Sequence, residues 1–546
     1  MESTRAIDKK GKALWRFAVL SAAGGLLLAL AAIWGANKQI LGLFHDDGIY
    51  AVVAQSISQG EGYRIISLPS KPPQTKYPFL YSYVLSWLWD LYPSFPQNIG
   101  LLKGLNSAIL ATIFISSAAL YRRYFPSART GALVFALLVC TNPIIFTYTD
   151  YLVSDLSYVA LALSVLVLAH GWMDSPAASP KLSFVAVLTG LACLIRLAAA
   201  PLALAGAVWV LIERGWRAAL YFCFIVFAII APWLVWVYLY AGDSTSPLFA
   251  YYSAYDFAGA KNFDGGEALT RHWSVVVGNA RYLLNSFDLL YLLPLMPGLA
   301  PFVLGLTVIG VIVSCRREDS FAWVFLAASA VLLLVWPFHP GRYLAPLVPL
   351  FILFFFRGTT SMERWIDSSG GDYKGKPLVA KLAWAPMALV LLLNGVWLSS
   401  YFMIKDEQTT RGLYGNRVPY AWQGFEESFA WIRQNTKADA RLATAYDPMY
   451  FLYTGRQAIR PALHRPASYF YPYGKAAPDV GSVTEITAEL EKLRIDYLII
   501  DPLDGYAEGK ATIRLLEDLV SSYGSRARNV FTSSDGKHRV YSLSIE

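Results

Sequence analysis

The sequence predicts a mainly α-helical, polytopic membrane protein with a small α/β domain at its C-terminal end. Hydrophobic residues make up 56% of its 546 residues, charged residues only 15%, and the mean hydropathy is +0.41. A soluble globular domain carries roughly 45–50% apolar and about 25% charged residues. Much of the surface is therefore expected to face lipid, which excludes a cytosolic enzyme, a secreted disulfide scaffold and a disordered chain. From about residue 404 the composition becomes that of an ordinary soluble domain.

Eleven segments are apolar enough to predict membrane-spanning helices, each of which needs about 20 mainly apolar residues. They are 17–36, 99–120, 131–148, 152–172, 183–196, 198–212, 218–240, 290–314, 321–337, 343–356 and 383–403. Two of them are short, and the two that flank Arg196 are equally consistent with one broken unit. The first is long and lacks a convincing small-residue cleavage site, so it predicts an uncleaved anchor and not a signal peptide.

The charges between these segments predict the orientation of the chain. The connections on one side total 76 residues and hold 18 Lys and Arg, whereas those on the other side total 117 residues and hold 9. Positive connections gather in the cytoplasm, so the N-terminus is expected inside and the C-terminal region outside. The net charge of +8 forms no basic stripe or tail, which argues against nucleic-acid binding. The chain has no Asn-x-Ser/Thr sequon, which favours a bacterial plasma (inner) membrane.

Two predicted outward connections are too long to be simple turns. The first, 37–98, contains a short amphipathic helix candidate at 50–59 and a Tyr-, Trp- and Leu-rich stretch at 79–92 that suits a helix in the membrane interface. The second, 241–285, is rich in Gly, Asp and Tyr and predicts an irregular loop over the outer face. Residues 1–403 are thus expected to form one transmembrane domain.

In the C-terminal region, 404–546, helical and strand-like patterns alternate. The helical patterns cover 424–434, 484–493 and 513–522, and the strand-like runs cover 441–446, 496–500 and 539–544. This alternation predicts a small α/β domain, which the charge distribution places outside the cytoplasm.

Acidic side chains stand where the first two outward connections meet the membrane. Asp46 and Asp47 closely follow the first span. Neighbouring carboxylates repel each other, so this pair favours a proton, a metal ion or a cation nearby. A general base for a lipid-linked substrate is one use of the pair, and a solvated helix-capping turn is the alternative. Asp155 begins a predicted span, where a carboxylate usually faces a cavity, although a simple helix cap is equally open.

Basic residues occur on the predicted outer side, against the charge bias. Arg342 stands between two spans, Arg196 between two short apolar segments, Lys103 inside the second span, and Lys76 just before the aromatic stretch. Arginine binds phosphate oxygens in bidentate fashion, and lysine binds them as a point charge. Their placement therefore indicates an anionic group on the outer side, with snorkelling to lipid headgroups as the alternative.

Three of the six histidines, His45, His272 and His339, fall in predicted outward loops. Together with Asp46 and Asp47 they are candidate ligands for a divalent metal ion, the one cofactor that the sequence suggests. No local ligand spacing supports such a site, and unpaired surface histidines are the alternative.

Taken in order along the chain, these motifs resemble those of the GT-C superfamily of integral-membrane glycosyltransferases. The likeness is to the branch of protein O-mannosyltransferases and lipid A aminoarabinose transferases, in which an acidic pair followed three residues later by Tyr opens the first outward loop. Its elements here are Asp46-Asp47-Gly48-Ile49-Tyr50, Lys76-Tyr77-Pro78 with Phe79–Trp89, Asp155, and Arg342-Tyr343 with Pro346 and Pro349. Tyr77 interrupts the Lys-Pro element of the family. The likeness covers residues 40–360 well and the rest loosely.

This resemblance implies a transferase that moves a sugar from a polyprenyl-phosphate donor to a lipid, glycan or protein acceptor on the outer face of the membrane, with inversion at the anomeric carbon. It implies that Asp46 is the general base and that Asp47 and Asp155 shape the site or hold a metal. The donor phosphate would be bound by Lys76, Arg196, Arg342 and Tyr343.

Two other classes of protein stay open from the sequence. A secondary transporter would account for many spans with charges inside them, but the chain shows no repeated halves. A non-catalytic sensor or assembly protein would account for the outward domain, and it would have no need of Asp46 and Asp47.

Overall fold

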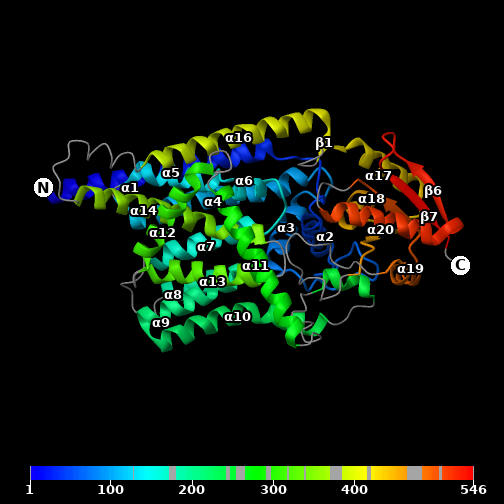
Figure 1. Cartoon of the computed structure of the whole chain (residues 1–546), viewed down its shortest axis with the longest axis horizontal. Helices are drawn as coiled ribbons and strands as arrows, with labels where there is room; N and C mark the ends of the chain where they lie inside the picture. Colours follow the sequence, from blue (N-terminus) through cyan, green and yellow to red (C-terminus); the bar gives the residue numbers. More distant parts are fainter. Residues whose placement is uncertain are drawn as a thin grey trace.

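The computed structural model describes residues 2–126, 128–170, 180–241, 246–253, 265–290, 297–315, 319–336, 340–368, 384–414, 420–463, 482–502 and 507–544. The molecule is elongated, with a helical bundle toward one end of its long axis and a smaller region that contains a β-sheet at the other (Figure 1). The chain begins at the far end of the bundle and finishes in the sheet region (Figure 1).

The bundle is built mainly from apolar helices. In chain order its helices are α1 (Glu2–Gly35), α4 (Ile99–Tyr124), α5 (Arg129–Cys140), α6 (Pro143–Phe146), α7 (Asp155–His170), α8 (Pro180–Ile195), α9 (Ala200–Arg214), α10 (Trp216–Tyr240), α11 (Gly265–Leu290), α12 (Ala300–Ser314), α13 (Ser320–Val335), α14 (Val348–Ser368) and α16 (Ala385–Arg411). Short 3₁₀ turns connect or extend them: η1 (Thr147–Thr149), η2 (Leu197–Ala199), η3 (Pro247–Tyr252), η6 (Pro297–Leu299) and η8 (Pro340–Leu347).

Helices overlap all eleven apolar segments predicted from the sequence, within the residues that the structure describes. Six of these helices are long and apolar enough to cross a membrane, or up to seven if the pair Arg129–Cys140 and Pro143–Thr149, bent by 57°, is one span. Four further apolar helices are shorter: Asp155–Ala169, Pro180–Ile195, Pro301–Ser314 and Ser320–Val335. The prediction of a mainly helical fold with several candidate membrane spans is therefore confirmed, and the count of eleven spans stays a prediction.

Helices α12 and α14 cross with their backbones in contact. A Cβ atom on Gly310 would stand 1.7 Å from the carbonyl oxygen of Phe354, and one on Gly358 would stand 1.8 Å from that of Leu306. Only glycine fits at both positions, because any side chain would overlap the facing backbone. Small residues allow this close approach of helices in membranes.

The prediction of an irregular loop over 241–285 is wrong in its second half, where the chain forms helix α11. Val275 and Asn279, one helical turn apart, are both buried, and the side-chain amide of Asn279 donates to backbone carbonyls near the end of α13. Burial of one face against α13 thus stabilises a helix that the Gly- and Asp-rich start of the segment hides in the sequence.

The C-terminal region contains a five-stranded mixed sheet in the order β4-β3-β5-β7-β6, in which β3 pairs in parallel with β4 and β5, and β7 pairs antiparallel with β5 and β6. Its elements are α17 (Gln423–Asn435), β3 (Arg441–Ala443), α18 (Asp447–Thr454), β4 (Gln457–Ile459), α19 (Val483–Lys492), β5 (Tyr497–Ile500), α20 (Ala507–Tyr523), η10 (Gly524–Arg526), β6 (Ala527–Thr532) and β7 (Arg539–Leu543). A two-stranded ribbon, β1 (Leu413–Tyr414) with β2 (Tyr420–Ala421), precedes it. Helices and strands occupy all six predicted positions, and α18, β4 and β6 are additional.

Two helices of the first predicted outward segment, α2 (Asp46–Ser58) and α3 (Leu80–Leu91), lie between the bundle and the sheet region (Figure 1). Tyr50 and Ala51 of α2 belong to the core of the bundle, whereas Val52 and Val53 belong to the core shared with the C-terminal region. The amphipathic helix predicted at 50–59 therefore begins earlier, at Asp46, and is buried on both sides. Helix α3 does expose an aromatic face that includes Trp87, as expected for an interfacial helix.

Candidate active site

Four charged residues from distant parts of the chain meet beside the buried helix α2. Asp46 is the first residue of α2 and Asp155 the first residue of α7. Arg196 lies in the extended break between α8 and η2, and Arg342 lies in η8. The positive end of a helix dipole favours a carboxylate in the first turn, which helps to hold both acids ionised where they stand.

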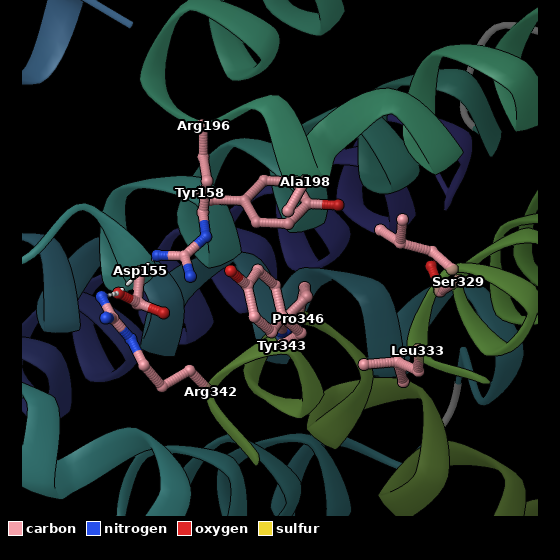
Figure 2. Close-up of a pocket in the computed structure, with 10 residues that line it drawn as sticks. Asp155, Tyr158, Arg196, Ala198, Ser329, Leu333, Arg342, Tyr343 and Pro346 are labelled. Atoms are coloured by element: carbon pink, nitrogen blue, oxygen red, sulfur yellow. Dashed lines mark hydrogen bonds and ion pairs between the residues drawn. The ribbon is translucent and has the colours of Figure 1, made fainter. Parts of the chain in front are cut away.

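Arg342 bridges the two carboxylates, with one guanidinium nitrogen on each. Its Nη1 donates to Oδ2 of Asp46, and its Nη2 donates to Oδ2 of Asp155 at 2.8 Å. The same oxygen of Asp155 also accepts from Nη1 of Arg196 at 2.6 Å. Asp155 therefore lies between two guanidinium groups (Figure 2). Because these charges are largely withdrawn from water, their mutual attraction is stronger than that of surface ion pairs.

A small pocket lies directly beside these ion pairs. Asp155, Arg196 and Arg342 form its polar wall, and its other lining residues are Tyr158, Ala198, Ser329, Leu332, Leu333, Tyr343 and Pro346. Figure 2 shows the ring of Tyr343 next to Arg196, whose guanidinium lies 4.7 Å from the ring centroid. The pocket thus joins a charged wall to a largely apolar one.

The second oxygen of Asp46 is also occupied. Its Oδ1 accepts from the hydroxyl of Tyr77 at 2.7 Å. Burial raises the pKa of Asp46, but the cations of Arg342 and Lys76 and the hydrogen bond from Tyr77 outweigh burial and hold it well below its usual range. Asp46 is therefore ionised at neutral pH, and its basicity depends on how tightly Arg342 is held.

Asp47 does not share the site with Asp46. It is 3% exposed, and its Oδ1 accepts from the backbone N–H of Gly48 at 2.8 Å. Burial raises its pKa to about 6, and Lys103 and backbone hydrogen bonds counter this only in part. Adjacent residues of a helix point in different directions, which is why the acidic pair separates. The sequence therefore predicted a pair where the structure places one carboxylate in the site and one behind it.

Lys76 reaches the same area from the chain segment before α3. Its Nζ donates to the backbone carbonyl of Tyr251 at 2.8 Å and lies 4.0 Å from the centroid of the Tyr251 ring. Burial lowers the pKa of Lys76 to about 8; Asp46 counters this shift, and Arg460 and Arg342 add to it. The amine remains mainly protonated at neutral pH and adds positive charge beside Asp46.

The predicted metal ligands do not come together within the described residues, where no three His, Cys, Asp or Glu side chains lie close enough to hold an ion. His45 instead contacts Asp447, with its Nε2 2.9 Å from Oδ1 of that residue. His272 belongs to α11, but its side chain, like all of His339, lies outside the described residues. A metal involving those two histidines stays a prediction.

Sequence reasoning missed several partners of the site. Tyr77, noted only as an interruption of the family's Lys-Pro element, donates to Asp46. The hydroxyl of Tyr50 pairs with that of Ser154, next to Asp155, at 2.9 Å. Phe44 lies under Arg342, with its ring centroid 4.8 Å from the guanidinium carbon. The available signal was position, since all of these residues flank predicted site residues.

The overall fold is similar to that of solved structures of other proteins. No family model and no curated protein match the chain. The solved structure of ArnT from Cupriavidus metallidurans bound to undecaprenyl phosphate has the same fold, with a TM-score of 0.54, 14% identity, and coverage of 96% of this chain and 97% of that one.

Archaeal oligosaccharyltransferase AglB from Archaeoglobus fulgidus, in complex with an inhibitory peptide and a dolichol-phosphate, is similar as well. Its TM-score is 0.56 at 13% identity, over 97% of this chain and 74% of that one. Both are GT-C superfamily members, so the resemblance predicted from the motifs is confirmed at the level of the fold.

Proposed function

We propose that the protein is a glycosyltransferase that moves a sugar from a polyprenyl-phosphate donor to a lipid, glycan or protein acceptor. The reaction takes place on the outer face of a bacterial inner membrane, with residues 1–403 as the transmembrane domain and 404–546 as an extracytoplasmic domain. The observation that carries this proposal is Arg342 held between Asp46 and Asp155 beside a pocket with one charged and one apolar wall. A base, an anion-binding fork and a lipid-compatible wall are what such a transfer requires.

Asp46 acts as the general base in this proposal. It removes the proton from the hydroxyl oxygen or amide nitrogen of the acceptor as this atom attacks the anomeric carbon. The bond between this carbon and the phosphate oxygen breaks on the opposite face. In the protein without a bound donor, the low pKa of Asp46 results largely from Arg342. A donor phosphate that draws Arg342 toward itself weakens this pairing and makes Asp46 a stronger base only when the donor is bound.

The departing phosphate is neutralised by Arg342 and Arg196, with Lys76 adding charge from the other side of Asp46. A phosphate is a good leaving group only when its developing charge is stabilised. Asp155 holds both arginines through a single oxygen, and the ring of Tyr343 supports Arg196. Asp155 therefore orients the two cations, and Asp47 supports the start of α2 from behind.

The ligands of the two solved relatives agree with this donor class. The ArnT structure holds undecaprenyl phosphate, and the AglB structure holds a dolichol-phosphate together with a peptide. Both lipids are polyprenyl phosphates, and the AglB peptide is an inhibitory one. These ligands support a polyprenyl-phosphate sugar as donor here and leave lipid, glycan and protein acceptors all within the proposal.

The test uses the full chain, purified in lipid nanodiscs and offered a panel of undecaprenyl-phosphate sugars with envelope lipids, glycans and peptides. Sugar transfer with release of undecaprenyl phosphate is expected from one donor. Envelope mass spectrometry of a strain that lacks the protein would identify the missing product. A transporter would move the donor lipid across a vesicle without cleaving it, and a sensor would bind ligands without turnover; either result overturns the proposal.

The proposed orientation has its own test. A reporter that is active only outside the cytoplasm should be active when fused after Glu546 and silent when inserted within 363–376. This expectation follows from the uneven distribution of Lys and Arg, 18 against 9, between the two sets of connections. The opposite pattern would place Asp46 and Arg342 on the cytoplasmic side and refute the site together with the topology.

A further inference from the structure

The first turn of α2, which carries Asp46, packs tightly against the first turn of α18 in the C-terminal region. A Cβ atom on Gly48 would stand 2.9 Å from Cβ of Pro448, and one on Gly42, whose φ is +98°, would stand 2.7 Å from Cβ of Met449. The two glycines let the backbones approach, so the chain segment around Asp46 is in direct contact with α18.

Within this junction, His45 adopts a strained backbone conformation. Its φ is 62° and its ψ is −58°, and the N–H of Asp46 donates to the carbonyl of Phe44 at 2.7 Å. This geometry is a γ-turn with a positive φ at its centre, a rare and strained form. Because the carbonyl of His45 accepts the first hydrogen bond of α2, from Ile49 at 3.0 Å, the turn fixes both the position of Asp46 and the direction of the helix.

The side chain of His45 is held from two sides. Its Nε2 lies 2.9 Å from Oδ1 of Asp447, a residue 402 positions away that is fully buried. The ring of Tyr251 packs edge-on against His45 with the centroids 5.1 Å apart. Tyr251 is also the residue whose carbonyl accepts from Lys76. A strained residue persists only when its surroundings over-determine it, and here those surroundings are Asp447 and Tyr251.

We infer that His45 and Asp447 form a clamp through which the C-terminal region holds the turn at Phe44–Asp46 and so aims the carboxylate of Asp46 at Arg342 and Tyr77. His45 is thus a positioning residue for the base and not a metal ligand. The inference rests on the proposed function for its effect on turnover, but the clamp itself is a statement about structure that is testable without any substrate.

The first experiment is hydrogen–deuterium exchange on the full chain in nanodiscs, with Asp447→Ala as the variant. Loss of the clamp should speed exchange of the amides of Asp46 to Ile49 roughly tenfold, because the turn that starts α2 is released. Asp439→Ala, which removes an exposed carboxylate from the same region, is the matched control and should leave these amides unchanged. Equal protection of this turn in Asp447→Ala and the wild type would overturn the clamp.

A second variant guards against a failure of Asp447→Ala to fold. His45→Asn keeps a residue that tolerates a positive φ but is too short to reach Asp447. It should therefore keep the fold and still speed exchange at Asp46. If His45→Asn protects this turn as well as histidine does, backbone preference alone holds it and the clamp is refuted.

Turnover supplies the readout that separates positioning from mere stability. Asp447→Ala should lower kcat by about 10- to 100-fold with KM for the donor unchanged, since a base displaced by an ångström loses rate before affinity. Asp447→Asn, whose Oδ1 still accepts from Nε2 of His45, should restore most of kcat. A rise in KM for the donor together with the fall in kcat, or no recovery of kcat in Asp447→Asn, would refute the positioning role of His45. If the wild type transfers no sugar, the proposed function fails, whereas the exchange result still decides the clamp.

Discussion

The molecule contains two buried ionic clusters, which differ in how completely their charged groups are paired. One is formed by Asp150 with two lysines, and the other by Asp46 and Asp155 with two arginines. In the first, Asp150 accepts from Lys103 at 3.1 Å and from the backbone of Asn37 at 2.8 Å through Oδ1, and from Lys405 at 2.6 Å through Oδ2. Lys103 also donates to the carbonyl of Asn37 at 2.8 Å. Its side chain is 4% exposed and that of Asp150 is 6% exposed, which leaves no place for a ligand.

The second cluster, around Arg342, is open. The side chain of Arg342 is 22% exposed and lines the pocket, and its Nε is buried with no hydrogen-bond partner among the described residues. Buried polar atoms of native proteins are nearly always paired, and this N–H lies at the pocket, where a bound water or ligand would accept from it. The comparison indicates that a charge inside a membrane protein points to function where its pairing is incomplete. The Asp150 cluster is fully paired and instead ties α1, α4 and α16 together.

The largest expected effect tests the open cluster at Asp46. Asp46→Asn removes the base but keeps the size and the acceptor oxygen for Tyr77, so turnover should fall by roughly 10²- to 10⁴-fold in a protein that stays folded because Asp155 still pairs with Arg342. Steady-state transfer and donor binding are measured on the same preparation. Full activity in Asp46→Asn would show that the open cluster binds a ligand without supplying the base.

The closed cluster should give the opposite result. Asp150→Ala leaves Lys103 and Lys405 facing each other without a counter-charge, which costs about 3–5 kcal/mol of stability when such a pair is buried. Unfolding of the detergent-solubilised protein measures this loss, and turnover per folded molecule should stay at the wild-type level. A variant of normal stability that has lost activity would break the distinction between the two clusters.

Asp47 gives a pH-dependent test of the residue behind the site. Its pKa is raised from 3.8 to about 6 in the folded protein, so its contribution to stability is complete below about pH 4 and is lost as the pH rises through 6. Asp47→Asn should therefore be more stable than the wild type above pH 6, by no more than about 3 kcal/mol, and equal to it below pH 4. The free energy of unfolding of the wild type and of Asp47→Asn is measured across this pH range, with the exposed Asp439→Asn as the control. Parallel curves for the wild type and Asp47→Asn would refute the assignment.

The smallest expected effect sharpens the role of Arg342. Arg342→Ala should weaken binding of undecaprenyl phosphate by roughly ten- to a hundredfold, the value of a charge-assisted hydrogen bond of about 1.5–3 kcal/mol. Arg342→Lys keeps the charge but cannot bridge Asp46 and Asp155, so it should recover only part of this affinity. Equal affinities for all three proteins would remove Arg342 from the phosphate site.

Local sequence patterns predicted those site residues whose charge is unusual in or beside an apolar segment. Asp46, Asp155, Arg196 and Arg342 are charges in or beside apolar segments, and the structure does bring all four together. The same reasoning included Lys103 among cations with an anionic partner outside, although Asp150 satisfies it within the protein. A pattern shows that a charge is misplaced; only the fold shows whether it is already paired.

What the sequence did not show depends on contacts between distant segments. Asp447 lies 402 residues from His45, and no local sequence pattern around either residue indicates that they pair. Helix α11 lies in a stretch that begins with Gly and Asp, and its stability comes from packing against α13. The separation of Asp46 from Asp47 follows from helix geometry, but only once the helix is known to begin at Asp46 instead of Tyr50.

The crossing of α12 and α14 has a mechanical consequence for the phosphate site. Helix α14 follows directly after η8, the turn that carries Arg342. Since Gly310 and Gly358 bring the two backbones into contact, no side chain between them can rotate to absorb a displacement. A donor that pulls on Arg342 therefore works against two helices that move as one body. The backbone that carries Arg342 therefore has little compliance, so a guanidinium that follows a donor phosphate moves by rotation of its own side chain. Adaptation to substrates of different size would fall to the other wall of the pocket, Leu332 and Leu333 of α13.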